Sequence, residues 1–251
     1  FEENKGQIAA IVLEPTIYEK PEEGFLQKVR KIADENDAIL ILDEIVTGFR
    51  YDLGGCQKYF ELKGDFVCFG KGMGNGLPIT AITGKTEFMN AFDELWVSST
   101  NNSEALSLAG TIAVINEMKE KNTIASCWKQ GEKLMKEWNE MVLDYDIDAQ
   151  MKGYPVRMKM ECLDSNGKES MPLKSLILQE MVKRGIFMSQ GVSFISYSHS
   201  SEDIQCTIDA LEETCNLISK IDNMDEINKL LEGNMPQSVW SMKIPPTKKK
   251  D

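Results

Sequence analysis

Four short apolar runs, most of them joined by stretches with helical character, constrain the fold of this chain more than any other feature. We predict strands at these runs, which cover residues 8–15, 38–45, 64–70 and 79–84. Run 38–45, AILILDEI, is apolar at nearly every position before its two acids, which indicates a strand buried on both faces. Because helical connections such as 23–37 separate the early runs, we predict an α/β fold with a mostly parallel sheet.

The second half of the chain is richer in helices. We predict long helices over 103–121, with Ser103 as the N-cap residue, and over 123–143. A smaller α+β unit follows, with its strands and helices predicted at 156–163, 172–185, 186–189, 193–197 and 201–219. The predicted boundaries are 1–122 for the larger sheet domain, 123–235 for a small C-terminal domain with its connecting helix, and 236–251 for a tail.

The composition disfavours several classes of function. The 251 residues are 42% hydrophobic, enough for one or two domains with a real core. A net charge of −12 disfavours binding to nucleic acid or to an anionic membrane surface. The six cysteines form no C-x-x-C pair and there is one histidine, which favours free thiols in a reducing cytoplasm over a zinc cluster. No apolar run reaches 18 residues, so we expect no membrane partner.

Lys71 directly follows the third apolar run and stands among glycines, in FGKGMGNG. The carboxyl end of a buried strand is the place where open α/β sheets bind ligands, and glycines allow a ligand to approach the backbone closely. A lysine in a partly dry site can form a Schiff base with a carbonyl group. The residues alone leave a second interpretation open, in which Lys71 is a surface lysine in a flexible glycine turn.

Asp43 ends run 38–45, within ILDEIVTGFR. A buried carboxylate needs a cationic partner. Pyridoxal phosphate (PLP) supplies such a partner, because its ring nitrogen stays protonated opposite a carboxylate. Asp43 and Lys71 at neighbouring strand ends therefore predict a PLP site. The alternatives for Asp43 are a helix N-cap and a salt bridge to Arg50.

Several motifs, all in family order, resemble the class III PLP-dependent aminotransferases. They are Glu14–Pro15, ILDEIVTGFRYDLGG, GDFVCFGKGMGNGLPITAITG, SSTNNSEALSLAG at 98–110 and RGIFMSQGVSFISYSHSSEDIQCTIDAL at 184–211. Within the family, the chain is most similar to the glutamate-1-semialdehyde aminomutase branch and its sugar-aminotransferase-like relatives. The resemblance covers most of residues 8–235. It implies a fold-type I PLP-dependent transferase, with residues 1–122 as the C-terminal part of the PLP-binding large domain.

The resemblance also implies a role for each matched residue. Lys71 matches the lysine that binds the cofactor as an internal aldimine and then moves a proton, and Asp43 matches the aspartate that faces the pyridine nitrogen. Ile45 matches a branched apolar residue packed on one ring face, although it could also be a core residue. Thr100 matches a threonine that reaches the cofactor phosphate of the partner subunit, which implies a homodimer with shared sites, although it could also be a helix-start residue.

The implied activity is transfer of an amino group between a small-molecule amino donor and a carbonyl acceptor, by a cytoplasmic aminotransferase or aminomutase. Arg50 either contacts a substrate carboxylate or braces Asp43 and Glu44, and Glu44 is expected to support the site rather than to react. His199 matches a position near the site entrance in some relatives, or is a surface or core histidine.

The chain departs from the family pattern in two ways. TNNSE stands where relatives often have a glycine pair, and the glycine-rich phosphate cradle and stacking aromatic ring of the family have no match. Since both lie upstream of the Asp43 equivalent in relatives, we expect this chain to be the C-terminal portion of such an enzyme. The alternative is a truncated or degenerate, non-catalytic piece that acts as a dimerisation or partner module.

Overall fold

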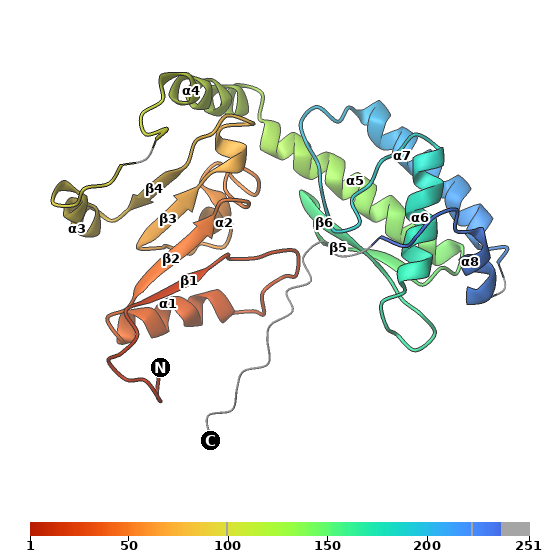
Figure 1. Ribbon diagram of the computed structural model, residues 1–251, viewed down its shortest axis with the longest axis horizontal. Helices are drawn as coiled ribbons and strands as arrows, with labels where there is room; N and C mark the ends of the chain where they lie inside the picture. The colour runs from red at the N-terminus through yellow and green to blue at the C-terminus, as the bar shows by residue number, and fades with distance from the viewer. Residues whose placement is uncertain (99, 222, 237–251) are drawn as a thin grey trace.

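A computed structural model describes residues 1–98, 100–221 and 223–236, and within them the chain forms two β-sheets (Figure 1). The larger sheet has the order β1-β2-β3-β4, formed by Ala10–Leu13, Ile39–Glu44, Phe66–Phe69 and Ala81–Gly84. β2 pairs in parallel with β1 and with β3, while β4 is antiparallel to β3. The predicted mostly parallel sheet is therefore confirmed.

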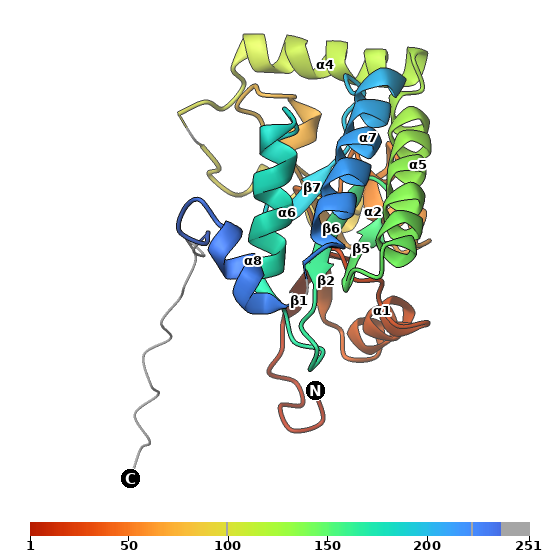
Figure 2. The ribbon, with the colours of Figure 1, turned by 90° about the vertical axis from the view of Figure 1, so that its right-hand side faces the viewer.

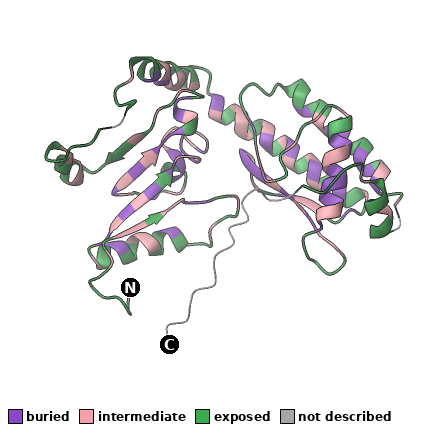
Figure 3. Ribbon diagram, in the orientation of Figure 1, coloured by how far each residue is buried: buried purple, intermediate pink, exposed green. Residues whose placement is uncertain are grey.

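The core of the larger sheet lies on one face only. Helix α1, Phe25–Glu35, buries Leu26 and Ala33 against the β2 residues Leu40 and Leu42. The other face is open among the described residues: Val12 of β1 is 65% exposed, and the β2 residues that alternate with Leu40 and Leu42 are less buried. The prediction of a strand buried on both faces is thus wrong for β2 as described, because α1 covers a single face (Figure 3).

Short helical segments join strands of the larger sheet: α2 (Gly55–Tyr59) lies between β2 and β3, and η1 (Lys71–Met73) lies between β3 and β4. After β4 the chain leaves the sheet through α3 (Thr86–Met89), η2 (Asn90–Asp93), α4 (Ala105–Glu120) and α5 (Thr123–Asp144). The predicted N-cap at Ser103 is wrong by one residue. The Glu104 carboxylate accepts hydrogen bonds from the Leu106 and Ser107 N–H groups at 2.8 and 2.7 Å. It satisfies two backbone donors at the helix start that a serine at 103 does not reach.

The smaller sheet is antiparallel and has the order β5-β6-β7, formed by Ala149–Tyr154, Arg157–Cys162 and Val192–Phe194. Helices α6 (Met171–Lys183), α7 (Ser201–Ile218) and α8 (Met224–Leu230) accompany it. Figure 2 shows α5, α6 and α7 side by side, and α5 packs on β5 while α6 packs on β6. The core between them is built by large side chains that are almost fully buried: Trp138, Met151, Met158, Met160, Leu176, Ile177 and Leu211.

The predictions for this second half are partly confirmed. The strand predicted at 156–163 and the helices at 172–185 and 201–219 correspond to β6, α6 and α7. The strand predicted at 186–189 is wrong, because these residues pair with no strand, and β5 was not predicted. No helix in the described part of the chain has the length and apolar character needed to cross a membrane. The predicted tail lies outside the described residues from position 237 onward.

Candidate functional site

The carboxyl ends of β2 and β3 bring three of the predicted site residues together. The two strands are parallel, and their register aligns Asp43 with Cys68. Lys71 follows three residues after Cys68 and therefore lies at the same sheet edge as Asp43. A Cβ atom added at Gly70 would stand 3.0 Å from Ile45 Cδ1, so the Ile45 side chain packs closely against the residue before Lys71. Asp43, Ile45 and Lys71 thus converge at one edge.

Asp43 presents its carboxylate to the outside of the sheet. The residue is exposed, and its Oδ1 accepts a hydrogen bond from the Ile45 N–H at 3.0 Å. No described residue forms an ion pair with it, and this hydrogen bond belongs to a turn rather than to a helix start. Both alternatives for Asp43, the helix N-cap and the salt bridge to Arg50, are therefore wrong. Its carboxylate remains available to an external cation.

Glu44 points to the opposite face, where it is fully buried. Its carboxylate accepts hydrogen bonds from the Thr47 hydroxyl, from the Cys56 N–H at 2.8 Å and from the Gln57 N–H at 2.6 Å. Burial raises the pKa of this carboxyl above its ordinary value, and these three hydrogen bonds oppose that shift. Glu44 therefore ties the turn after β2 to the first residues of α2.

Lys71 begins η1 directly after Gly70, and its side chain is exposed. Its backbone has φ of +40°, in the left-handed region that residues other than glycine seldom adopt. The surrounding structure has to hold such a conformation, as it does at seven other positions of the described chain that are not glycine. Within the described chain the Lys71 amine forms no ion pair. The lysine is consequently a free amine at the same edge as the free carboxylate of Asp43.

The structure does not bring the other predicted residues to this edge. Thr100 is exposed on the connection between η2 and α4, and in the described part of the chain no hydrogen bond joins it to Asp43, Ile45 or Lys71. His199 is also exposed, and its Nδ1 accepts a hydrogen bond from the Ser196 N–H at 3.3 Å. The surface alternative for His199 is the one that this position fits.

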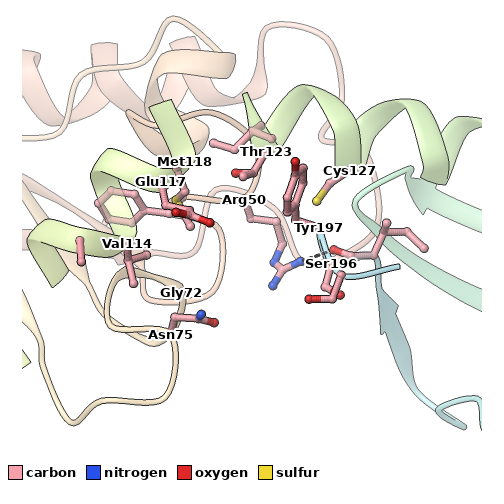
Figure 4. A pocket seen from close by; sticks show the side chains of 15 residues that line it. Arg50, Gly72, Asn75, Val114, Glu117, Met118, Thr123, Cys127, Ser196 and Tyr197 are labelled. Carbon is pink, nitrogen blue, oxygen red and sulfur yellow. Dashed lines mark hydrogen bonds between the residues drawn. The ribbon is translucent and has the colours of Figure 1, made fainter. Parts of the chain in front are cut away.

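A cavity of about 460 Å³ lies beside the Lys71 turn (Figure 4). Gly72 and Asn75, which follow Lys71, form one wall, and α4, the start of α5 and the segment after β7 form the others. Its polar lining groups come from distant parts of the chain: Arg50, Glu117, Thr123, Cys127, Ser196, Tyr197 and Ser198. Apart from Arg50, these residues were not predicted, because no local pattern shows which distant segments meet at a cavity.

Arg50 projects from the turn after β2 into this cavity (Figure 4). Its Nη1 donates to the carbonyl oxygens of Val156 at 3.4 Å and Ile195 at 3.3 Å, and its guanidinium lies 4.4 Å from the centre of the Phe194 ring. Burial lowers the pKa of the guanidinium, which nevertheless stays charged. It forms no hydrogen bond or ion pair with Asp43 or Glu44, so the alternative in which Arg50 braces these two acids is wrong.

The chemistry of this edge is that of a free carboxylate and a free amine; neither Asp43 nor Lys71 lines the cavity, which begins at Gly72. No cluster of three His, Cys, Asp or Glu side chains suited to a metal ion is found among the described residues. The pair fits a ligand that presents a cationic group to Asp43 and a carbonyl carbon to Lys71. PLP carries both groups, so these residues fit the predicted cofactor.

Comparisons with known proteins match most of the chain. A family model described as aminotransferase class III matches residues 1–215. A glutamate-1-semialdehyde 2,1-aminomutase of Alkaliphilus oremlandii is 31% identical over 235 residues, which cover 88% of this chain and 55% of the relative. A transaminase solved with PLP bound has a TM-score of 0.78 at 18% identity, and covers 87% of this chain and 54% of its own. An omega-transaminase from Sphaerobacter thermophilus has a TM-score of 0.75 at 21% identity, with coverages of 86% and 53%.

These likenesses have two consequences. The structural matches confirm the predicted fold, that of the fold-type I transferases, since both have TM-scores well above 0.5. The chain spans about half the length of the curated relatives and solved structures that it matches.

Proposed function

The chain belongs to the class III aminotransferase family, and from this premise we propose that it carries a PLP site for amino-group transfer. The observation that carries the proposal is the meeting of Asp43 and Lys71, each without an ionic partner in the described chain, at the adjoining ends of β2 and β3. Relatives named as aminomutases and transaminases support either outcome of the transfer. The substrates are a small amino donor and a carbonyl acceptor.

The residues that would hold the cofactor follow from their positions. Lys71 would bind its aldehyde carbon, Asp43 would face its ring nitrogen, and Ile45 would pack on its ring. PLP bound there supplies an electron sink for the substrate carbon. The Asp43 carboxylate holds a proton on the ring nitrogen. The Lys71 amine takes a proton from the substrate carbon and returns it as general acid.

The assembly around this site is also part of the proposal. Thr100, exposed and apart from the other three residues, would serve the phosphate of the cofactor in a partner subunit of a homodimer. Helix α4 offers a surface for such a dimer contact, because its large apolar residues Leu106, Leu108 and Ile112 are exposed. We retain residues 1–122 and 123–235 as the proposed domains, and a cytoplasmic location in accord with six free cysteines.

The test is to trap the lysine that reacts with PLP. The chain is incubated with PLP, reduced with borohydride and digested, and the modified lysine is identified by mass spectrometry. Lys63→Ala is the matched control, because Lys63 is exposed at the opposite end of β3. We expect modification to concentrate on Lys71 in wild type and in the control, and to fall by about tenfold or more with Asp43→Asn.

The trapping experiment also separates the two hypotheses for the chain. In Lys71→Ala, the site-specific modification should disappear while background modification of surface lysines stays. If wild type instead shows modification spread over the exposed lysines with no preference for Lys71, the proposal fails and the non-catalytic module gains support.

A further inference from the structure

Two asparagine–glycine pairs occur in the sequence, and the structure holds them differently. They are Asn75–Gly76, in the turn that follows Lys71, and Asn166–Gly167, in the loop between β6 and α6. An asparagine before a glycine can modify itself, because without a Cβ atom the glycine nitrogen can approach the side-chain amide closely. The amide becomes an acid in this reaction, which adds a negative charge to the protein.

The Asn75–Gly76 pair occupies the centre of a tight turn at the surface. Both residues are exposed, their φ angles are +46° and +106°, and the Leu77 N–H donates to the Gly74 carbonyl oxygen at 3.1 Å. Positive φ at both central residues of such a turn strongly favours asparagine followed by glycine. The geometry of the turn therefore explains why this reactive pair stands here.

The groups that would react are free in this turn. Within the described chain, the Gly76 N–H donates no hydrogen bond and the Asn75 side chain forms none. No heavy atom lies within 4 Å of a Cβ atom placed at Gly76, so there is space for a ring to form. The amide carbon and the attacking nitrogen can thus meet without breaking a hydrogen bond of either group.

The Asn166–Gly167 pair is also exposed, but Asp164 restrains it. The Gly167 N–H donates to the Asp164 carbonyl oxygen at 2.9 Å, and Asp164 Oδ1 accepts from the N–H groups of Asn166 and Lys168, both at 2.9 Å. The Gly167 nitrogen must give up its hydrogen bond before it can attack, which should slow ring closure by about fivefold. The sequence alone does not distinguish the two pairs.

We propose that Asn75 is a site of spontaneous deamidation. The Gly76 nitrogen loses its proton and bonds to the side-chain carbonyl carbon of Asn75, while the bond from that carbon to the side-chain nitrogen breaks and ammonia leaves. Water then opens the resulting succinimide ring. Cleavage between the nitrogen and the side-chain carbon gives aspartate, and cleavage between the nitrogen and the main-chain carbon gives isoaspartate. The net reaction consumes water and releases ammonia.

The position of this turn gives the modification a consequence for Lys71. In isoaspartate the main chain runs through the side chain of residue 75, which lengthens the turn. The Asn75 N–H donates to the Lys71 carbonyl oxygen at 3.1 Å. On the other side α4 packs closely, because a Cβ atom at Gly110 would stand 2.1 Å from Leu77 Cδ1. A lengthened turn cannot keep both contacts, so isoaspartate should displace Lys71. That this lowers PLP capture rests on the proposed function, whereas the deamidation itself does not.

The test follows both pairs in one sample. The 251-residue chain is incubated at mildly alkaline pH and digested, and mass spectrometry after chromatography quantifies aspartate and isoaspartate at both positions. We expect modification at Asn75 to proceed about fivefold faster than at Asn166 in folded protein, and the two rates to converge in urea. Isoaspartate is diagnostic, because direct hydrolysis of the amide gives aspartate only. Equal or faster modification of Asn166 in folded protein, an unchanged difference in urea, or no isoaspartate at position 75 would each overturn the proposal.

PLP trapping then measures the consequence for the site. Partly deamidated protein is treated with PLP and borohydride, and residue 75 is read in peptides with and without the label on Lys71. We expect isoaspartate to be depleted among the labelled peptides, and Asn75→Gly, which suits the positive φ but has no amide, to keep its PLP capture through the same incubation. Equal isoaspartate in both peptide pools would overturn the displacement of Lys71. Absence of label at Lys71 before any incubation would overturn the proposed function, while the deamidation result stands.

Discussion

The Glu44 carboxylate accepts a hydrogen bond from the backbone N–H of Cys56 at 2.8 Å, across twelve positions of the sequence. The contact joins the end of β2 to the start of α2 on the buried face of the sheet. Since successive residues of a strand point to opposite faces, anchoring Glu44 inward directs Asp43 outward. The acid that we assign to the cofactor therefore depends for its orientation on the acid beside it.

Replacing Glu44 should change how stability depends on pH. Burial raises the pKa of Glu44, so the folded state binds its proton more tightly than the unfolded state does. The stability from this group is fully present below the unfolded value of 4.5, and it is lost as pH rises through the higher folded pKa. We expect the stability advantage of wild type over Glu44→Gln, measured by urea unfolding, to be largest at low pH and to shrink as pH rises.

The control for this experiment is Glu94→Gln, since Glu94 is exposed. Its difference from wild type should stay small across the same pH series. A difference between wild type and Glu44→Gln that did not vary with pH would contradict the assignment of a raised pKa.

The ion pair between Arg157 and Glu14 should stabilise the junction of the two sheets. Arg157 lies at the start of β6, and its Nη1 is 2.5 Å from the Glu14 carboxylate beyond β1. The arginine side chain is only 6% exposed, so Glu14→Gln leaves a buried charge without a counter-ion. We expect the free energy of unfolding to fall by about 2–4 kcal/mol. The control is Glu35→Gln, which breaks the exposed ion pair with Lys31 and should lower the free energy of unfolding by about 0.5 kcal/mol. Equal losses of stability in the two variants would contradict the greater contribution of the Arg157–Glu14 pair.

Gly131 should not tolerate alanine, although it lies inside helix α5. A Cβ atom at this position would stand 2.0 Å from the carbonyl oxygen of Pro155, a backbone atom that cannot move aside alone. Glycine to alanine normally stabilises a helix by about 1 kcal/mol. Here we expect a loss of about 1–3 kcal/mol in thermal or urea unfolding. Gly233→Ala, where no atom lies within 4 Å, is the control and should change little.

The cysteines should differ sharply in reactivity. Burial raises the pKa of Cys162 and of Cys215 to about 12, so neither forms appreciable thiolate at pH 8. Cys206 is exposed on α7. We expect a thiol reagent to label Cys206 first, and to label Cys162 and Cys215 only after unfolding, as followed by mass spectrometry of peptides. Similar rates at all three positions would show that the packing around α7 is looser than described.

Much of the site could be predicted from the sequence, because its residues lie at or directly after the ends of predicted strands. The apolar runs before Asp43 and Lys71 predict β2 and β3, and the parallel arrangement of such strands brings their carboxyl ends to one edge. The local patterns were less informative elsewhere. β5 has the sequence AQMKGY, whose apolar content is too low to predict a strand, and it forms because β6 offers a complete ladder of partners.

The sequence by itself determined the order of the main elements, the family of the chain and the edge at which Asp43, Ile45 and Lys71 meet. These follow from periodicity and motifs, which are local properties of the chain. Only the tertiary structure decided the partners of Arg50, whose carbonyl acceptors lie 106 and 145 positions away. The structure also decided that Glu44, and not Asp43, is the buried acid, because burial depends on how the turn after β2 and the start of α2 fold over one face of the sheet.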